Sequence, residues 1–347
     1  ILDDAYTELA ELERWFKLTY RLSLNDKCPA SVELAADDEK IAFCLPDRRL
    51  RIRRNQVDVW GGTLQGEAWS VKEDAPASDM WPLDAQDYSS YLYWRTVPCP
   101  TGAPEEEYAD HADDIARALV RNHCGELAAP DRRWLDLTVE PDAHLAPSTS
   151  KRFVGGNVRQ HLIDLAKGEG LWWFLQPGPT GPTFRVRYPL YGLDRTVGNG
   201  VNDELVFERE MQNIQELNYR RDASEHFNCA YVYGAGEAPN RPLEIVQDAM
   251  AVAAHRRRES WVDASEYTLA ADLQAEGARA NREKRVSETL TVVPAQGAIG
   301  PENLGDKVSI RETRYGRTFY TAAIVVAMNV TVDADGIEVI TPEFVAA

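Results

Sequence analysis

Histidine and cysteine side chains are common protein ligands of transition metals, and this chain of 347 residues has six histidines and five cysteines. A zinc site is usually marked by close pairs such as His-Glu-x-x-His or Cys-x-x-Cys. Neither pattern occurs among His111, His123, His144, His161, His226 and His255, or among Cys28, Cys44, Cys99, Cys124 and Cys229. His123 and Cys124 are adjacent, but two further ligands are missing near them. The sequence therefore predicts no metal site, and an odd number of scattered cysteines argues against a disulfide framework.

Two glycine-containing segments have the residue types of ligand-binding loops. Gly234-Ala235-Gly236 follows an expected strand, but no third glycine and no immediate helix complete a dinucleotide-binding loop. Asp333-Ala334-Asp335-Gly336 begins like a calcium loop, yet its twelfth position is Phe344 and not an acid. Both segments are therefore predicted to be turns. No Gly-x-Ser-x-Gly pattern marks a serine hydrolase, and the sequence predicts no cofactor.

Paired carboxylates are the remaining enzyme signal, because a glycosidase needs only two acids at a suitable separation. The chain has 56 acidic side chains, so the choice of any one pair is uninformative. Asp113 and Asp114 lie on an expected helix beside other acids, which favours a solvated helix face over an acid/base couple. We therefore predict no catalytic residue and no enzyme activity.

Aromatic residues cluster at Tyr88, Tyr91, Tyr93 and Trp94, and again at Trp172-Trp173. Such side chains can stack on sugars or on bases. In strands, alternate aromatic residues more often face a core, while those on the other face can enter a protein interface. We expect a core role first, an interface role second and a ligand-binding role third.

The charge balance bears on possible partners. With 38 basic and 56 acidic side chains the net charge is −18 at pH 7, which disfavours binding to nucleic acid or to anionic lipid. The longest apolar run is about half of the roughly 20 residues that cross a bilayer, and residues 1–15 do not resemble a secretory signal. The sequence therefore predicts no membrane span and no sequence-specific nucleic-acid binding. The scattered cysteines suit assembly in a reducing cytoplasm.

The predicted fold is α+β and β-rich, with two antiparallel β-barrel-like domains flanking an inserted α+β domain. The first β-barrel-like domain covers residues 1–100, where apolar and polar residues alternate from Val32 to Leu45 across a turn-like 36–39 and predict a hairpin. The insertion covers residues 101–205. Its expected elements are a helix opening at Glu105–Glu107, a helix from Val158 to Gly168, and strands at 171–175 and 184–188.

The second β-barrel-like domain covers residues 206–347 and contains one long helix at about 265–285. Asp263 and Glu266 resemble a capping box for this helix. Its predicted buried stripe is Leu269, Leu273, Gly277 and Ala280. Asp335-Gly336 predicts a hairpin turn between the last two strands.

Six short motifs, read in order, resemble the Gp37-like minor tail proteins of siphophages, which are similar to the baseplate hub family of tailed bacteriophages. The motifs are Val57-Asp-Val-Trp-Gly-Gly, Glu67-Ala-Trp, Leu135-Asp-Leu-Thr-Val, Tyr233-Gly-Ala-Gly-Glu, Arg258-Glu-Ser-Trp-Val-Asp-Ala and Leu304-Gly-Asp-Lys-Val-Ser-Ile. The resemblance implies a structural protein of the virion tail tip, assembled in the host cytoplasm. It also implies a homotrimer whose two barrel-like domains per chain form a pseudo-sixfold ring beneath the tail tube.

The partners implied by this resemblance are further copies of the chain, distal tail or tail tube proteins, and a central fibre or other tip proteins. DNA would only pass through the lumen during genome ejection. Two other functions stay open from the residues alone. One is a tail-associated peptidoglycan hydrolase, which needs a buried acid pair in a cleft. The other is a carbohydrate-binding receptor-recognition module that uses Tyr91, Tyr93 or Trp172.

Overall fold

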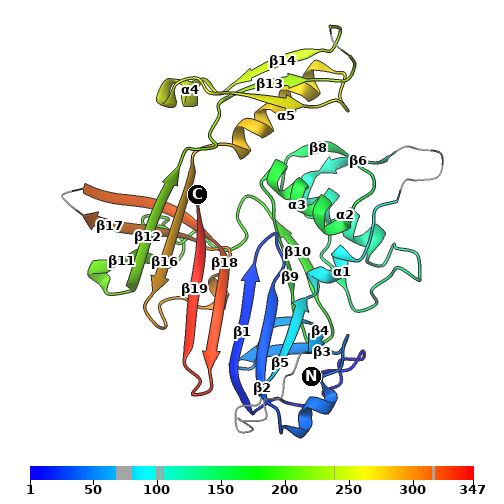
Figure 1. Ribbon diagram of the computed structural model, residues 1–347, viewed down its shortest axis with the longest axis vertical. Coiled ribbons are helices and arrows are strands. Elements are labelled where there is room, and N and C mark those ends of the chain that lie inside the picture. The colour runs from blue at the N-terminus through cyan, green and yellow to red at the C-terminus, as the bar shows by residue number, and fades with distance from the viewer. Residues whose placement is uncertain (68–79, 99–101, 103–104, 238, 315–316) are drawn as a thin grey trace, which may run out of the picture. The chain divides into compact units, whose positions relative to one another are not determined.

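The computed structural model describes residues 1–67, 80–98, 102, 105–237, 239–314 and 317–347 (Figure 1). The chain divides into two compact units. Unit 1 comprises residues 1–217, 292–345 and 347, and unit 2 comprises residues 218–291 with Ala346. Strand is the commonest regular structure, so the predicted β-rich α+β fold class is confirmed. The three-domain division expected from the sequence stays a prediction about folding units.

One sheet of 11 strands is built from both ends of the chain. Five strands come from the first hundred residues: β1 (Trp15–Ser23), β2 (Pro29–Ala35), β3 (Arg49–Arg54), β4 (Val57–Glu67) and β5 (Met80–Asp87). The others are β11 (Val206–Glu208), β12 (Ile214–Asp222), β16 (Ser287–Pro294), β17 (Lys307–Arg314), β18 (Arg317–Asp333) and β19 (Glu338–Ala346). The order is β12-β16-β19-β18-β1-β2-β5-β4-β3, and β17 pairs with both β18 and β11.

Strand β18 joins the two β-rich segments into this single sheet. It is 17 residues long, so its first half pairs with β17 and its second half, Ala327–Asp333, pairs with β1. The two expected barrel-like domains therefore share a strand. Over the described residues the sheet stays open, with β12 and β3 as the ends of the order, and the expected closure into barrels is not found.

The predicted hairpin from Val32 to Leu45 is wrong in its second half. Residues Glu39–Phe43 form a 3-10 helix, because the Asp38 carboxylate caps it by accepting a hydrogen bond from the Lys40 backbone N–H at 2.9 Å. Phe43 and Leu45 are 43% and 50% exposed, so the alternation there does not reflect burial. Strand β2 pairs instead with β1 and with β5, and the β5 partners lie 45 or more residues further along.

A middle segment of unit 1 contains most of its helices. Its elements are α1 (Ser89–Tyr93), β6 (Glu106–His111), α2 (Ala112–His123), β7 (Thr138–Val139), β8 (Ser148–Phe153), α3 (Val158–Glu169), β9 (Trp172–Gln176) and β10 (Thr183–Arg187). β7, β10 and β9 form one small sheet, and β6 and β8 form another. The expected helix at Glu105–Glu107 is wrong in its first turns, because residues 106–111 pair with β8 as a strand and the helix begins at Ala112.

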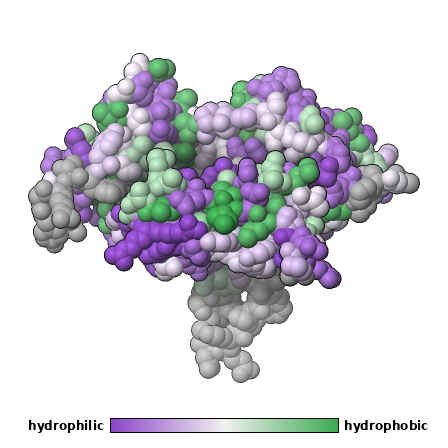
Figure 2. Space-filling model, turned by 90° about the horizontal axis from the view of Figure 1, so that it is seen from above, coloured by the Kyte–Doolittle hydropathy of each residue, from purple (hydrophilic) through white to green (hydrophobic). Residues whose placement is uncertain are grey.

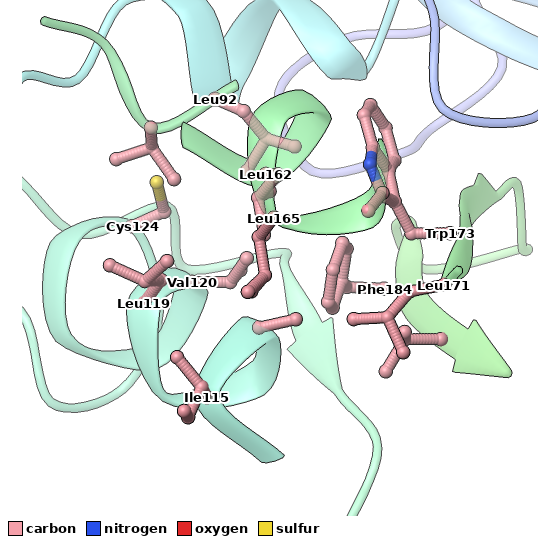
Figure 3. Packing of buried hydrophobic residues seen from close by; sticks show 14 of the residues in the cluster. Leu92, Ile115, Leu119, Val120, Cys124, Leu162, Leu165, Leu171, Trp173 and Phe184 are labelled. Atoms are coloured by element: carbon pink, nitrogen blue, oxygen red, sulfur yellow. The ribbon is translucent and has the colours of Figure 1, made fainter. Parts of the chain in front are cut away.

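The core of this middle segment lies between α2, α3 and the β9–β10 hairpin. Leu119 and Val120 of α2 point toward Leu165 of α3 (Figure 3). Trp173 and Phe184 close the cluster from the hairpin, with ring centroids 6.2 Å apart. The predicted helix from Val158 and the two strands after it are confirmed.

Unit 2 is a two-layer structure of one small sheet and one long helix. The elements are β13 (Cys229–Tyr233), β14 (Leu243–Gln247), α4 (Ala249–His255), β15 (Glu259–Asp263) and α5 (Ala270–Glu283), and the sheet order is β14-β13-β15. Helix α5 packs on β13 and β14. Its predicted stripe is confirmed at Leu273, Gly277 and Ala280, but Leu269 is 64% exposed. The capping box is wrong, because Asp263 ends β15 and the helix begins at Ala270.

Gly277 sets the distance between α5 and the sheet. A Cβ atom at this position would lie 2.5 Å from Cγ2 of Val246 and 2.8 Å from Cγ2 of Val232, closer than carbon atoms approach. Only a glycine therefore permits this spacing. Among the helices of the described ranges, none is both long and apolar enough to cross a bilayer.

Candidate functional site

Four cysteines and His123 lie in the interior of the protein. Cys28, Cys44, Cys124 and Cys229 are buried and none of the four is in a disulfide, while Cys99 lies outside the described residues. His123 does not pair with Cys124. Its Nε2 lies 2.9 Å from the Glu106 carboxylate, and burial lowers the pKa of His123 although Glu106 opposes the shift.

The glycine-containing segments are turns, as predicted. Gly336 has φ of 79° in the β18–β19 hairpin, where the Asp333 carboxylate accepts hydrogen bonds from the backbone of Asp335 and Ile337. Gly234 follows β13, and its N–H donates to the Pro242 carbonyl at 2.9 Å. Neither segment opens a helix, unlike a phosphate-binding loop or the calcium loop of an EF-hand.

The acid pair on α2 is buried, so the expected solvated face is wrong. Asp113 and Asp114 are 0% and 3% exposed and lie 2.7 and 2.6 Å from the Arg117 guanidinium. Burial alone would raise the pKa of Asp113, but hydrogen bonds from the Ala146 backbone and from Arg117 hold it below its usual value. An ionised, ion-paired carboxylate is a poor general acid. The pair also accepts hydrogen bonds from the backbone of residues 143–146, and these bonds position that loop.

Two of the four residues of the first aromatic cluster lie in the core, and the other two are exposed. Tyr88 and Tyr91 are each 2% exposed, and Tyr91 stacks on Trp134 with ring centroids 4.0 Å apart. Tyr93 and Trp94 are 52% and 40% exposed, because these residues form the short helix α1 and not a strand with two alternating faces.

Trp172 and Trp173 are adjacent in β9 but differ in burial. Trp173 is buried. Trp172 is partly exposed, and its indole N–H donates to the Pro189 carbonyl at 3.0 Å. A pair of adjacent residues in a strand points to opposite faces, so only one of the two tryptophans enters the core.

A polar centre missed by the sequence reasoning surrounds Asp136. The hydroxyl of Tyr6 donates to its carboxylate at 2.7 Å, and the Arg49 guanidinium lies 3.1 Å away. Arg49 also stacks over the Tyr6 ring at 4.4 Å. These contacts fasten the first residues of the chain to β3 and to the middle segment, which is a structural role.

The open face of unit 2 is the strongest candidate for a functional surface. We define it as Tyr231, Tyr233, Leu243, Ile245 and Trp261, on the side of the β14-β13-β15 sheet that α5 leaves uncovered. Register aligns Ile245, Tyr231 and Trp261 in one row across the three strands. Leu243, Ile245 and Trp261 are 43%, 52% and 62% exposed.

Charged side chains border the open face. The Arg257 guanidinium lies 5.9 Å from the Tyr231 ring centroid, and that of Arg241 lies 5.6 Å from the Tyr233 ring centroid. An exposed row of large apolar residues with an arginine rim is typical of protein interfaces. On the face of the molecule that Figure 2 shows, hydrophobic side chains gather in small groups between hydrophilic ones. The sequence signal was present in β14, where apolar residues fall on both faces, Leu243 and Ile245 on one and Val246 on the other.

A family model described as Siphovirus ReqiPepy6 Gp37-like protein matches residues 1–344. The chain belongs to this family. The resemblance inferred from six short motifs is thereby confirmed. No curated protein sequence matches this Gp37-like chain.

Solved structures share the fold of the Gp37-like chain. The 43 kDa tail protein of prophage MuSo2 from Shewanella oneidensis has a TM-score of 0.61 at 13% identity, over 95% of this chain and 94% of that one. A tail protein from Neisseria meningitidis MC58 has a TM-score of 0.62 at 12% identity, over 96% and 92%. The c3393 protein of E. coli, a component of the type VI secretion system, has a TM-score of 0.51 at 9% identity, over 96% and 74%. This Gp37-like protein thus has the fold of these phage tail proteins.

Proposed function

We propose that this protein is a hub subunit of the tail tip or baseplate. Three copies form a ring that joins the tail tube to the distal tip and lets DNA pass. The observation that carries the proposal is the composition of the large sheet. Residues before 100 contribute five of its strands, and residues after 205 contribute six, among them β18, which joins the two groups. A ring of three such chains contains six similar groups of strands, two from each chain.

The fold comparisons support the same assignment. The c3393 protein is described as structurally similar to the T4 bacteriophage tail proteins gp27 and gp5. The two tail proteins from Shewanella and Neisseria match over more than nine tenths of their own length, so the whole chain and not one module has the tail-protein fold. The hub role, the threefold stoichiometry and the passage of DNA are our inference from this fold.

The open face supports assembly with a second protein. A ring that holds during genome ejection requires large contacts, on the order of 2,000 to 5,000 Å² per obligate interface. Aromatic residues and arginines at the centre of such contacts contribute most of the binding free energy. Trp261 and Tyr231, with Arg257 beside them, provide this combination on a flat sheet surface.

Charge supports a passage that does not bind DNA. Residues 218–291 carry 12 acidic and 10 basic side chains, so most of the net charge of −18 belongs to unit 1. Acidic walls repel the phosphate backbone over about 8 to 10 Å at physiological salt. A balanced unit 2 is better suited to protein contacts than to lining the passage.

The test is a cryo-microscopy map of whole virions together with two variants of the phage. We expect three copies of the protein around the tail axis. Trp261→Asp places a charge on the open face and should reduce incorporation into particles at least tenfold. Val201→Asp is the matched control, since Val201 is 87% exposed in unit 1, and it should incorporate normally. Absence of the protein from virions, or digestion of purified cell walls by it, would contradict the proposal.

A further inference from the structure

Three potential metal ligands meet where β6 ends and α2 begins. One ligand atom each from Asp110, His111 and His144 lies within 4.8 Å of the others, and the rings of His111 and His144 have centroids 5.0 Å apart. Asp110 and His111 are the last residues of β6, whereas His144 comes from the loop before β8. The cluster belongs entirely to unit 1.

Both imidazole rings are held by a contact of their Nδ1 atom. Nδ1 of His144 lies 2.6 Å from Oδ2 of the buried Asp114, and Nδ1 of His111 lies 2.5 Å from the Ala146 carbonyl oxygen. Each acceptor fixes the proton on Nδ1, so the lone pair is on Nε2. A histidine that donates its other N–H to a carboxylate or a backbone carbonyl is the usual arrangement behind a metal ligand.

The loop that carries His144 is rigidly anchored. Asp114 accepts hydrogen bonds from the backbone of Ala143 and His144, and Asp113 accepts them from Leu145 and Ala146. His144 itself has φ of 52°, a strained conformation for a residue other than glycine. Two buried carboxylates, ion-paired with Arg117, thus hold the exposed His144 close to the partly buried His111.

We propose that Asp110, His111 and His144 bind a divalent transition-metal ion, with zinc the preferred one. Two imidazole nitrogens and one carboxylate oxygen form a mixed nitrogen and oxygen ligand set that suits zinc in tetrahedral geometry. The His144 side chain is 62% exposed, so the fourth position is open to water or to a ligand from another molecule. The bound ion would link the β6–α2 junction to the 143–146 loop.

The experiment uses the full chain after treatment with a chelator, titrated with Zn²⁺ alone by calorimetry and with Co²⁺ by visible absorption. We expect one ion per chain and the absorption bands of four-coordinate Co²⁺. His144→Asn keeps a residue that tolerates positive φ, so the fold should persist, as circular dichroism will check. Zinc affinity should fall at least tenfold in this variant and in His111→Gln.

The matched control is His255→Ala. His226 and His255 also form a close ring pair, with centroids 5.4 Å apart, but over the described residues no carboxylate joins them in a group of three ligands. Zinc affinity should be unchanged in this control. Absence of zinc binding, or binding that His144→Asn and His111→Gln leave intact, would overturn the proposal.

Discussion

The middle segment of unit 1 and the whole of unit 2 are built from similar parts, helices packed on a small sheet, but they bury very different amounts of apolar surface. In the middle segment 22 buried residues form one continuous cluster, whereas the cluster of unit 2 has four. The small core of unit 2 follows from its two layers. Helix α5 covers one side of the sheet, and the open face covers nothing within the unit.

This difference in core size indicates that the two units have different roles. A segment with a large core can hold strained or ionised groups, such as His144 and the Asp113–Arg117 ion pair, in fixed positions. A unit with a small core and an exposed aromatic row gains stability when a partner covers that row. We therefore expect unit 1 to provide the rigid frame and unit 2 to provide the adjustable contact.

The largest effect is expected for Arg117→Met in unit 1. The variant leaves two buried carboxylates without their cation, which costs about 3 to 5 kcal/mol of the free energy of unfolding. Urea unfolding at pH 7 measures this loss. Arg152→Met is the control, because Arg152 and its partner Glu107 are 65% and 64% exposed and such pairs contribute about 0 to 1 kcal/mol.

The stability of the unmodified protein and that of Arg117→Met should depend on pH in different ways. The pKa of Asp113 is lower in the folded protein than its ordinary value of 3.8, so its contribution to stability is present above that pH and is lost as the pH falls below about 4. In Arg117→Met the unpaired carboxylate should instead protonate at higher pH. The stability difference between the two proteins should narrow on acidification, and a difference that widens would refute the ion-pair account.

The sequence predicted some elements from a local signal. Helix α3 has an apolar stripe and ends at Gly170 in the left-handed region, two residues beyond the predicted Gly168, and the Asp335-Gly336 turn joins two adjacent strands. Residues 106–111 were assigned to a helix because their acids suit a helix N-terminus. Pairing with β8, about 40 residues later, decides their structure, and no local pattern records it.

The residues of the candidate sites likewise come together through contacts between distant parts of the sequence, which no local pattern predicts. His111 and His144 are 33 positions apart in the sequence and meet only because Asp113 and Asp114 fold the 143–146 loop back onto α2. One signal was available: Arg117 follows the two acids at i+4 and i+3, a spacing at which opposite charges pair on a helix. That spacing favours a paired network over a solvated acidic face.

A smaller effect is expected when equivalent leucines are replaced in the two cores. Leu119 and Leu273 are both 0% exposed. Replacement by alanine costs about 2 to 5 kcal/mol, depending on how far the surroundings close over the cavity. We expect Leu119→Ala near the upper value, because rigid neighbours surround it, and Leu273→Ala near the lower one, because one sheet face of unit 2 is free to relax. Hydrogen exchange should show lost protection in unit 1 and unit 2 respectively, and equal costs would remove the contrast.

The smallest effect, and the sharpest contrast, comes from one substitution made in a helix of each unit. Gly277→Ala forces a methyl group against Val246 and Val232, and overpacking of this kind costs about 1 to 3 kcal/mol. Gly168→Ala in α3 meets no other atom within 4 Å, so the higher helix propensity of alanine should stabilise the protein by about 0.5 to 1 kcal/mol. Thermal unfolding of the two variants measures both the expected loss and the expected gain of stability. If Gly277→Ala were neutral, α5 could move away from its sheet freely, and the core of unit 2 would be looser than its close helix–sheet contact indicates.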